Sequence, residues 1–135
     1  MRVERFRPAD KHTFDAWLTE RGRPPLHKDV LPEMGFMAHH EQGPAACCFV
    51  YQTDSEAGIM GWTTTSPDLN MTMRVKYRAV EALIEAVKDH ARAMGWSFVF
   101  HFSSAHGLTS RLEEHGFHVS KLAHSICLWK VQDGD

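Results

Sequence analysis

The sequence has few cysteines, no long apolar run and almost no net charge. Two of its three cysteines are the neighbours Cys47 and Cys48, which rarely bridge, so a secreted disulfide framework is excluded and a reducing compartment is indicated. Met1 is followed by charged residues, and no apolar run approaches the ~18 residues that span a bilayer. Fifteen basic and seventeen acidic residues give a formal charge of −2, which provides no field to hold a polyanion. We therefore expect a cytoplasmic protein that binds neither nucleic acid nor membrane.

What the chain does contain is enough for one hydrophobic core. Its 135 residues are 43% hydrophobic and 24% charged, which is typical of a single globular domain over residues 1–135. A chain of this length buries roughly 65–70% of the surface that its unfolded form exposes. It should therefore fold without a disulfide or a structural metal.

The first third of the sequence predicts one strand and two helices. The alternation over Val3–Phe6 predicts a short strand that ends before Pro8. A helix follows from Asp10, whose carboxylate is expected to cap the first turn, and it ends at Gly22. Leu26–Glu33 is compatible with a second, short helix.

Three strand-like runs come next. Met34–Glu41 and Ala45–Thr53 flank a turn, which predicts a hairpin. A third run over Ala57–Thr65 is rich in β-branched and aromatic residues and stops at Ser66. These runs predict an antiparallel meander.

The period of the apolar residues then changes to that of a helix. From Arg74 onward they recur at steps of three and four, and Gly95 closes the pattern. The apolar positions are Val80, Leu83, Ile84, Val87, Ala91 and Met94. A long amphipathic helix is the clearest prediction from this sequence.

The last third predicts a buried strand, a helix and a final strand region. Trp96–Phe102 is almost wholly apolar, as in a strand that is covered on both faces. Ser103 or Ser104 can cap a helix that stops at Gly116, and Phe117–Val131 alternates well enough for one or two strands. The order β-α-α-β-β-β-α-β-α-β predicts an α/β fold with a mixed sheet, which is parallel where the long helix returns the chain.

The start of the long helix carries the most suggestive chemistry. Met71–Val80 contains Arg74, Lys76 and Arg78 and no acid. The unpaired amides and the positive dipole end of a helix that follows a strand attract anions, and a charge-assisted hydrogen bond to phosphate contributes about 1.5–3 kcal/mol. The alternative is a solvated basic turn without a ligand.

Several of these residues resemble the GNAT superfamily of acetyl-CoA-dependent N-acetyltransferases. Pro67 stands three residues after Thr64, before the long helix, and Gly116-Phe117 is similar to the pair that follows the last helix of that family. The long helix carries Leu83, Ile84, Ala91 and Gly95 at similar places. With the order of elements, this resemblance implies a GNAT-like acyl-CoA N-acyltransferase fold, acetyl-CoA as co-substrate and transfer of its acetyl group to an amine.

The resemblance also implies a cofactor-binding segment. The family pattern Q/R-x-x-G-x-G/A, whose amides approach the CoA pyrophosphate, is matched by 74–79, with Tyr77 in place of the middle glycine. The strand before Pro67 would contact pantetheine through its backbone. The implied cofactor-binding residues are Thr64, Thr65, Arg74, Lys76, Tyr77, Arg78 and Ala79.

Histidines are the candidates for the base that deprotonates the acceptor amine. His101 shares a face with Val99 in the strand where the family binds the acetyl group, although a core histidine is the alternative interpretation. His106, at the start of the next helix, is the second candidate. Tyr51 and Tyr77 are more distant candidates for the acid that protonates the CoA thiolate.

Three positions depart from the family pattern and favour a different function. Besides Tyr77, the helix tyrosine of the family corresponds to Leu112 and its usual asparagine to Ala105. These departures favour a non-catalytic GNAT-fold binding protein with a degenerate CoA site and a protein partner. Small GNAT-like proteins of tailed phages look similar. Arg74, Arg78 and Ala79 instead favour a retained cofactor site.

For the enzyme, we expect the acceptor between the loop Arg23–Glu33 and the carboxyl edge of the sheet. It would be a small amine, a protein N-terminus or a lysine, and the sequence does not choose among them.

A metal site is the remaining alternative. His39, His40, Cys47 and Cys48 fall in one predicted hairpin. Neighbouring strand residues point to opposite faces, so each face would receive one histidine and one cysteine, whereas a closed zinc site needs four converging ligands. We therefore expect no metal.

Overall fold

The computed structural model describes residues 1–103, 106–120 and 125–131. The elements are β1 (Arg2–Arg5), α1 (Asp10–Glu20), the 3₁₀ turn η1 (Lys28–Val30), β2 (Gly35–His40), β3 (Gly43–Gln52), β4 (Ala57–Thr65), α2 (Met73–Met94), β5 (Phe98–Ser103), α3 (His106–Glu114), β6 (His118–Val119) and β7 (Ser125–Lys130). The chain divides into two compact units, the first comprising 1–49 and 62–83 and the second comprising 50–61 and 84–135. β3, β4 and α2 each run from one unit into the other.

The strands form a mixed sheet in the order β1-β2-β3-β4-β5-β7-β6. β1 with β2, β2 with β3, β5 with β7 and β6 with β7 are antiparallel pairs. β4 and β5 are parallel, with Ala57 opposite Phe98 and Met60 opposite His101. The predicted α/β fold, with a meander followed by a parallel return through the long helix, is confirmed.

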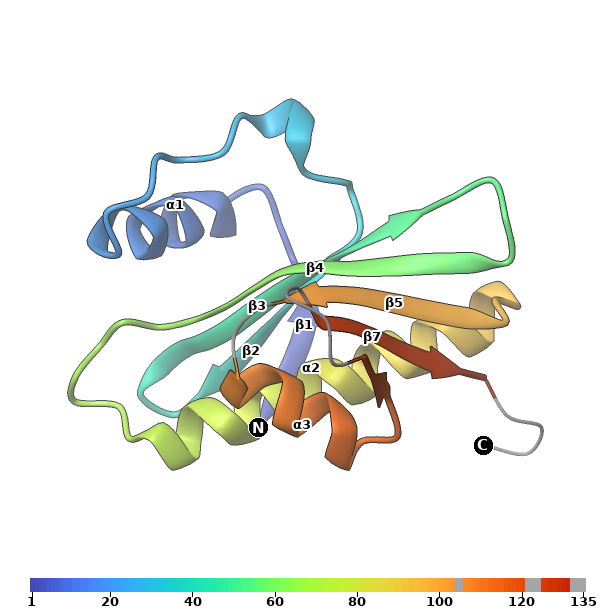
Figure 1. The fold of residues 1–135 in the computed structure, drawn as a ribbon. Coiled ribbons are helices and arrows are strands. Elements are labelled where there is room, and N and C mark those ends of the chain that lie inside the picture. Colours follow the sequence, from blue (N-terminus) through green and yellow to red (C-terminus); the bar gives the residue numbers. More distant parts are fainter. Residues whose placement is uncertain (104–105, 121–124, 132–135) are drawn as a thin grey trace. The chain divides into compact units, whose positions relative to one another are not determined.

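A cluster of aromatic side chains forms one part of the core of the first unit. α1 lies on one face of β2 and β3, and the first turns of α2 lie on the other face (Figure 1). The ring of Phe49 on β3 has its centroid 5.2 Å from that of Phe14 on α1 and 4.7 Å from that of Phe6. Gly35 makes this packing possible, because a Cβ at that position would lie 2.8 Å from the Phe49 ring. The first unit therefore holds α1 against the sheet.

In the second unit, Trp96 packs between His90 on α2, whose ring centroid is 5.4 Å away, and Gly58 on β4. A Cβ on Gly58 would lie 2.1 Å from the Trp96 ring, so the glycine on β4 provides the space for the indole. Along β5, Val99 and His101 are buried, whereas Phe102 on the other face is 58% exposed. The expectation of a strand covered on both faces was therefore wrong at the end of β5.

Local details of the N-terminal part differ from the sequence predictions. The second helix is only the 3₁₀ turn η1. The Asp10 carboxylate does not cap α1, because it accepts a hydrogen bond from the preceding Arg7 amide (2.8 Å), and the N-cap residue, Ala9, makes no side-chain cap. The described parts of 117–131 contain the two strands β6 and β7, and Ser104 lies outside the described residues. None of the described helices combines the length and apolar character that a bilayer crossing requires.

Candidate functional site

The loop that leads from β4 into α2 is held by its own polar side chains. The Ser66 amide donates to the Ala45 carbonyl (2.8 Å), which keeps the end of β4 against β3. The Asp68 amide donates to Ser66 Oγ (3.2 Å), and the Asn70 amide donates to Asp68 Oδ1 (2.9 Å). Such side-chain turns fix a short loop without regular structure. These bonds fix the entry to α2.

Thr72 caps α2 and leaves part of the helix start unsatisfied. Its Oγ1 accepts a hydrogen bond from the Val75 amide (3.2 Å), and its carbonyl accepts one from the Lys76 amide (3.1 Å). The amides of Met73 and Arg74 have no acceptor among the residues that the structure describes. Two free donors at the positive end of a 22-residue helix form a place where an anion is favoured.

The first two turns of α2 also carry three cations, Arg74, Lys76 and Arg78. Arg74 and Arg78 are exposed and lie one helical turn apart, whereas Lys76 is only 6% exposed. None of these side chains makes a hydrogen bond or ion pair with a residue in the described ranges. A like-charge pair at this spacing costs about 0.2–0.5 kcal/mol, and a cation at a helix N-terminus about 0.3–1 kcal/mol. The free protein is therefore destabilised locally by this arrangement, which a bound anion would relieve.

The segment matched to the family pattern is helical from its first residue. Tyr77 is half-buried and Ala79 is fully buried, and both lie in the second turn of α2, where backbone amides bond the carbonyl four residues earlier. The free amides are therefore those of Met73 and Arg74, and Met73 was missed by the sequence interpretation. Thr72 is the signal that could have located them, since threonine is a preferred N-cap residue.

Thr64 and Thr65 lie at the end of β4, next to a strained residue. Trp62 has a φ of +54°, the left-handed region that costs roughly 1–2 kcal/mol for a residue with a side chain, and it is 40% exposed. Thr64 Oγ1 donates to the Trp62 carbonyl (2.8 Å), and Thr65 Oγ1 accepts a hydrogen bond from Arg21 Nη2 (3.1 Å). Residues held in such conformations cluster at ligand-binding positions, so this end of β4 is a second candidate feature of the site.

The predicted base, His101, lies in the second unit. It is 2% exposed, shares the buried face of β5 with Val99, and burial lowers its pKa to about 4. At neutral pH its imidazole is therefore uncharged and can accept a proton, but weakly. His106 begins α3, and its side chain is not among those described.

The residues considered for the thiolate acid also belong to different parts of the chain. Leu112, at the position of the family tyrosine, is fully buried in α3, and Ala105 lies outside the described residues. Tyr51 is half-buried in β3, and its ring is 3.5 Å from the place of a Cβ on Gly61. The cofactor residues lie in the first unit, with Tyr77, whereas Tyr51 and both histidines lie in the second.

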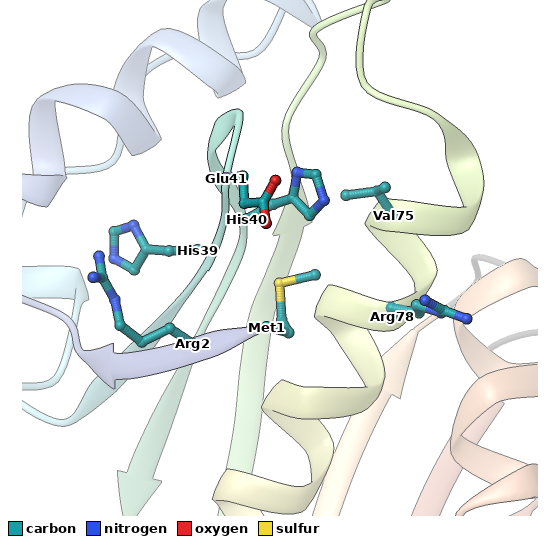
Figure 2. Close-up of a pocket in the computed structure, with 7 residues that line it drawn as sticks. All are labelled: Met1, Arg2, His39, His40, Glu41, Val75 and Arg78. Atoms are coloured by element: carbon teal, nitrogen blue, oxygen red, sulfur yellow. The ribbon is translucent and has the colours of Figure 1, made fainter.

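A cleft of about 600 Å³ opens beside α2 in the first unit (Figure 2). It is lined by Met1, Arg2, His39, His40, Glu41, Val75 and Arg78. His40 Nδ1 accepts a hydrogen bond from the Gln42 amide (3.2 Å), and Arg2 pairs with Glu4 (3.1 Å). Of the predicted cofactor residues only Arg78 lines the cleft, and in Figure 2 its guanidinium extends away from His40 and Glu41. The cleft thus shares Arg78 with the three cations of the α2 start, but the Arg78 guanidinium is directed away from His40 and Glu41.

The histidines and cysteines of the hairpin are separated along its length. His39 pairs with Pro44 near the turn, whereas Cys47 pairs with Met37 further along β3. Burial raises the pKa of Cys47 well above its usual value and that of Cys48 to about 12, so both remain thiols. Within the described ranges no three histidine, cysteine or acidic side chains are placed to hold a metal ion.

Comparison with known proteins gives matches in structure alone. No protein-family model matches the sequence, and no curated protein matches it. Among solved structures, the chain is similar to N-acetylglutamate synthase from Neisseria gonorrhoeae complexed with coenzyme A and N-acetyl-glutamate (TM-score 0.72, 17% identity, 97% of this chain and 35% of that one). The chain therefore spans about a third of that enzyme.

Two further structures match along most of their own length. They are aminoglycoside 6'-acetyltransferase type Ii (TM-score 0.76, 12% identity, 100% of both chains) and a GNAT family N-acetyltransferase from Escherichia coli in complex with CoA (TM-score 0.70, 12% identity, 98% of this chain and 82% of that one). The protein thus has the fold of the GNAT acyl-CoA N-acyltransferases, as the sequence resemblance implied.

Proposed function

We propose that the protein is an acyl-CoA-dependent N-acetyltransferase that binds the CoA pyrophosphate at the start of α2. The observation that carries this proposal is a set of donors there that have no partner among the described residues: the amides of Met73 and Arg74 and the side chains of Arg74, Lys76 and Arg78, with no acid in the first turn. A pyrophosphate supplies the negative charge that this helix start needs. The CoA-bound structures with the same fold support this choice of anion.

The remaining cofactor contacts follow from the position of β4. Thr64 and Thr65 end the strand that leads into the α2 loop, so their backbone groups are the proposed partners of the pantetheine arm. Ala79 is buried within α2, and Tyr77 stands where the family has a glycine. The cations replace amide contacts that a glycine-rich loop would make.

In the proposed reaction, the acceptor amine attacks the thioester carbonyl carbon of acetyl-CoA. The new C–N bond forms, the C–S bond breaks, and CoA leaves as a thiolate that takes up a proton. His101 is the proposed base that receives the proton of the amine, with His106 as the second candidate. Tyr51 and Tyr77 are the proposed donors of the proton to the thiolate. The acceptor is a small amine or an amine of a protein.

A second candidate function is a GNAT-fold protein that binds a partner without catalysing acyl transfer. Two observations favour it: Leu112 is a fully buried apolar residue at the position of the family acid, and the pKa of His101 is too low for an efficient base near neutral pH. Such a protein would retain a CoA site or a remnant of one. The similarity to small phage proteins stays a prediction.

The proposal is tested by thermal unfolding with acetyl-CoA. A ligand at a hundredfold excess over its Kd stabilises the native state by about 2.7 kcal/mol, so the melting temperature should rise. The double variant Arg74→Ala and Arg78→Ala should lower the affinity by roughly a hundredfold or more and remove the rise. Arg5→Ala is the matched control, because Arg5 is also exposed and has no ionic partner among the described residues.

Two results would overturn the proposal: no stabilisation of the wild type by acetyl-CoA, or equal stabilisation of the double variant. Release of free thiol from acetyl-CoA in the presence of an amine panel then separates the two candidate functions. Binding without release under any amine would support the non-catalytic protein.

A further inference from the structure

The turn that ends α1 holds two arginines in a fixed relation. Gly22 has a φ of +72°, its amide donates to the Thr19 carbonyl (3.0 Å), and the Arg23 amide donates to the Leu18 carbonyl (2.9 Å). These paired hydrogen bonds around a left-handed glycine are the Schellman motif, a rigid helix ending. Arg21 and Arg23 flank this glycine. Their backbones are therefore set by the helix end.

Arg21 connects this turn to the end of β4. Its Nη1 donates to the Trp17 carbonyl in the last turn of α1 (3.4 Å), and its Nη2 donates to Thr65 Oγ1 (3.1 Å), 44 residues away in sequence. A guanidinium has five N–H groups, so three of them remain for a ligand. Thr65 is the last residue of β4, where the proposed function places the donor molecule. Arg21 is thereby held next to the proposed reaction site.

Arg21 and Arg23 form a positively charged pair at the end of α1. Neither Arg21 nor Arg23 forms an ion pair with a residue in the described part of the chain. Partial burial and then the neighbouring Arg23 cation lower the pKa of Arg21, and the exposed Glu20 opposes this shift only in part. Two guanidinium groups near each other, one of them already oriented, form a place that attracts an anion.

The chain after the pair is also restrained. Pro24 and Pro25 follow directly, and a proline restricts the residue before it to extended conformations, which fixes Arg23. Lys11 Nζ on α1 donates to the Leu26 carbonyl (2.8 Å), so the loop returns along the helix. A restrained site loses little conformational freedom when a ligand binds.

We infer that Arg21 and Arg23 bind an anionic group of the acceptor, so that the acceptor is an amine that also carries a carboxylate. This inference rests on the proposed N-acetyltransferase function and names the substrate class of the same site. Arg21 offers its remaining N–H groups beside Thr65, and Arg23 supplies the second charge. A planar carboxylate suits the fork of a guanidinium, and a phosphate would be held by the same groups.

The experiment compares acceptors that differ only in the anionic group. Amino acids are assayed against the corresponding amino-acid amides, and phosphoethanolamine against ethanolamine, by release of CoA thiol. We expect the carboxylate-bearing amines to have the lowest KM. Arg23→Ala should raise that KM by roughly ten- to hundredfold, the effect of losing one charge-assisted hydrogen bond, and should leave the neutral amines within about twofold.

Arg21 is tested separately because it also caps α1. Arg21→Lys keeps the charge and loses the fork, so it should raise the KM for the carboxylate amines while the protein remains folded. Arg5→Ala, three strands from β4 in the sheet order, is the control and should leave every KM unchanged.

The inference is overturned if amino acids and the corresponding amino-acid amides are used equally well. It is also overturned if Arg23→Ala raises the KM of the neutral amines as much as that of the carboxylate-bearing amines. A preference for phosphoethanolamine over all amino acids would overturn the carboxylate assignment in favour of a phosphate. If acetyl-CoA neither stabilises the protein nor is consumed with any amine, the proposed function itself fails, and this inference fails with it.

Discussion

The two ends of α2 hold their cations in opposite ways. Lys76 in the first turns and Lys88 in the later turns are almost equally buried, 6% and 9% exposed. The Lys76 amine has no acceptor among the described residues, whereas the Lys88 amine donates to the carbonyl of His115 at the end of α3. Two lysines of similar burial therefore differ in their partners: Lys88 has an acceptor, and Lys76 has none in the described part of the chain.

The neighbours of Lys88 extend this contrast. Its amine lies 4.8 Å from the centroid of a Trp129 ring, and the Arg92 guanidinium lies 5.1 Å from a Trp129 ring as well. Arg92 Nη1 also pairs with Asp89 (2.9 Å). Cations that bond to the protein itself stabilise the fold, whereas the cations at the start of α2 make no such bond with the described residues. The two ends of one helix thus differ in whether their cations have partners within the described protein, and the unpartnered cations are the ones to which the proposed function assigns the CoA pyrophosphate.

The largest expected effect comes from His101, a buried group of the second unit whose charge is disfavoured. Its pKa is about 4 in the folded protein and about 6.5 when unfolded, so the unfolded chain binds the proton first. Its contribution to stability is therefore complete above about pH 6.5 and is lost as the pH falls toward 4, by up to about 3 kcal/mol. The free energy of unfolding, measured by urea denaturation at each pH from 4 to 8, should depend less steeply on pH for His101→Gln than for the wild type.

Phe102→Ser, an exposed change on the same strand, is the control and should keep the wild-type dependence of the free energy of unfolding on pH. The same pH dependence for wild type and His101→Gln would contradict the burial that the structure gives this histidine.

The second effect concerns Lys88, which has partners. Lys88→Met keeps the length of the side chain but leaves the His115 carbonyl without its donor and removes the cation over Trp129. We expect the free energy of unfolding to fall by about 2 kcal/mol. Lys130→Met, at an exposed position of β7, should change it by less than about 0.5 kcal/mol. Similar losses of unfolding free energy in both variants would contradict a stabilising role of the Lys88 contacts.

The smallest effect on stability is expected at Lys76. Lys76→Met removes a buried amine that has no acceptor in the described ranges, so the free energy of unfolding should stay within about 1 kcal/mol or rise. The affinity for acetyl-CoA should nevertheless fall by roughly tenfold, which isothermal titration would measure. A loss of stability as large as that of Lys88→Met would show that Lys76 is a structural cation too.

Much of the architecture could be predicted because it depends on local patterns. The apolar period from Val80 to Met94 located α2, and the β-branched run Ala57–Thr65 matched β4 at both ends. The alternation around His101 correctly placed it on the face of Val99. Periodicity failed for Leu26–Glu33, where η1 is a single turn, because Pro24, Pro25 and Pro32 leave few consecutive amides for a helix.

The candidate site was predictable only in its charges. The sequence by itself determined that cations without acids begin α2 and that the turn after α1 has the order Arg-Gly-Arg-Pro-Pro, because both are properties of neighbouring residues. Only the tertiary structure decided that Arg21 reaches Thr65 and that Lys88 reaches His115, since these contacts join residues 44 and 27 positions apart. Whether a cation finds a partner depends on which elements pack together, and a local pattern does not contain that information.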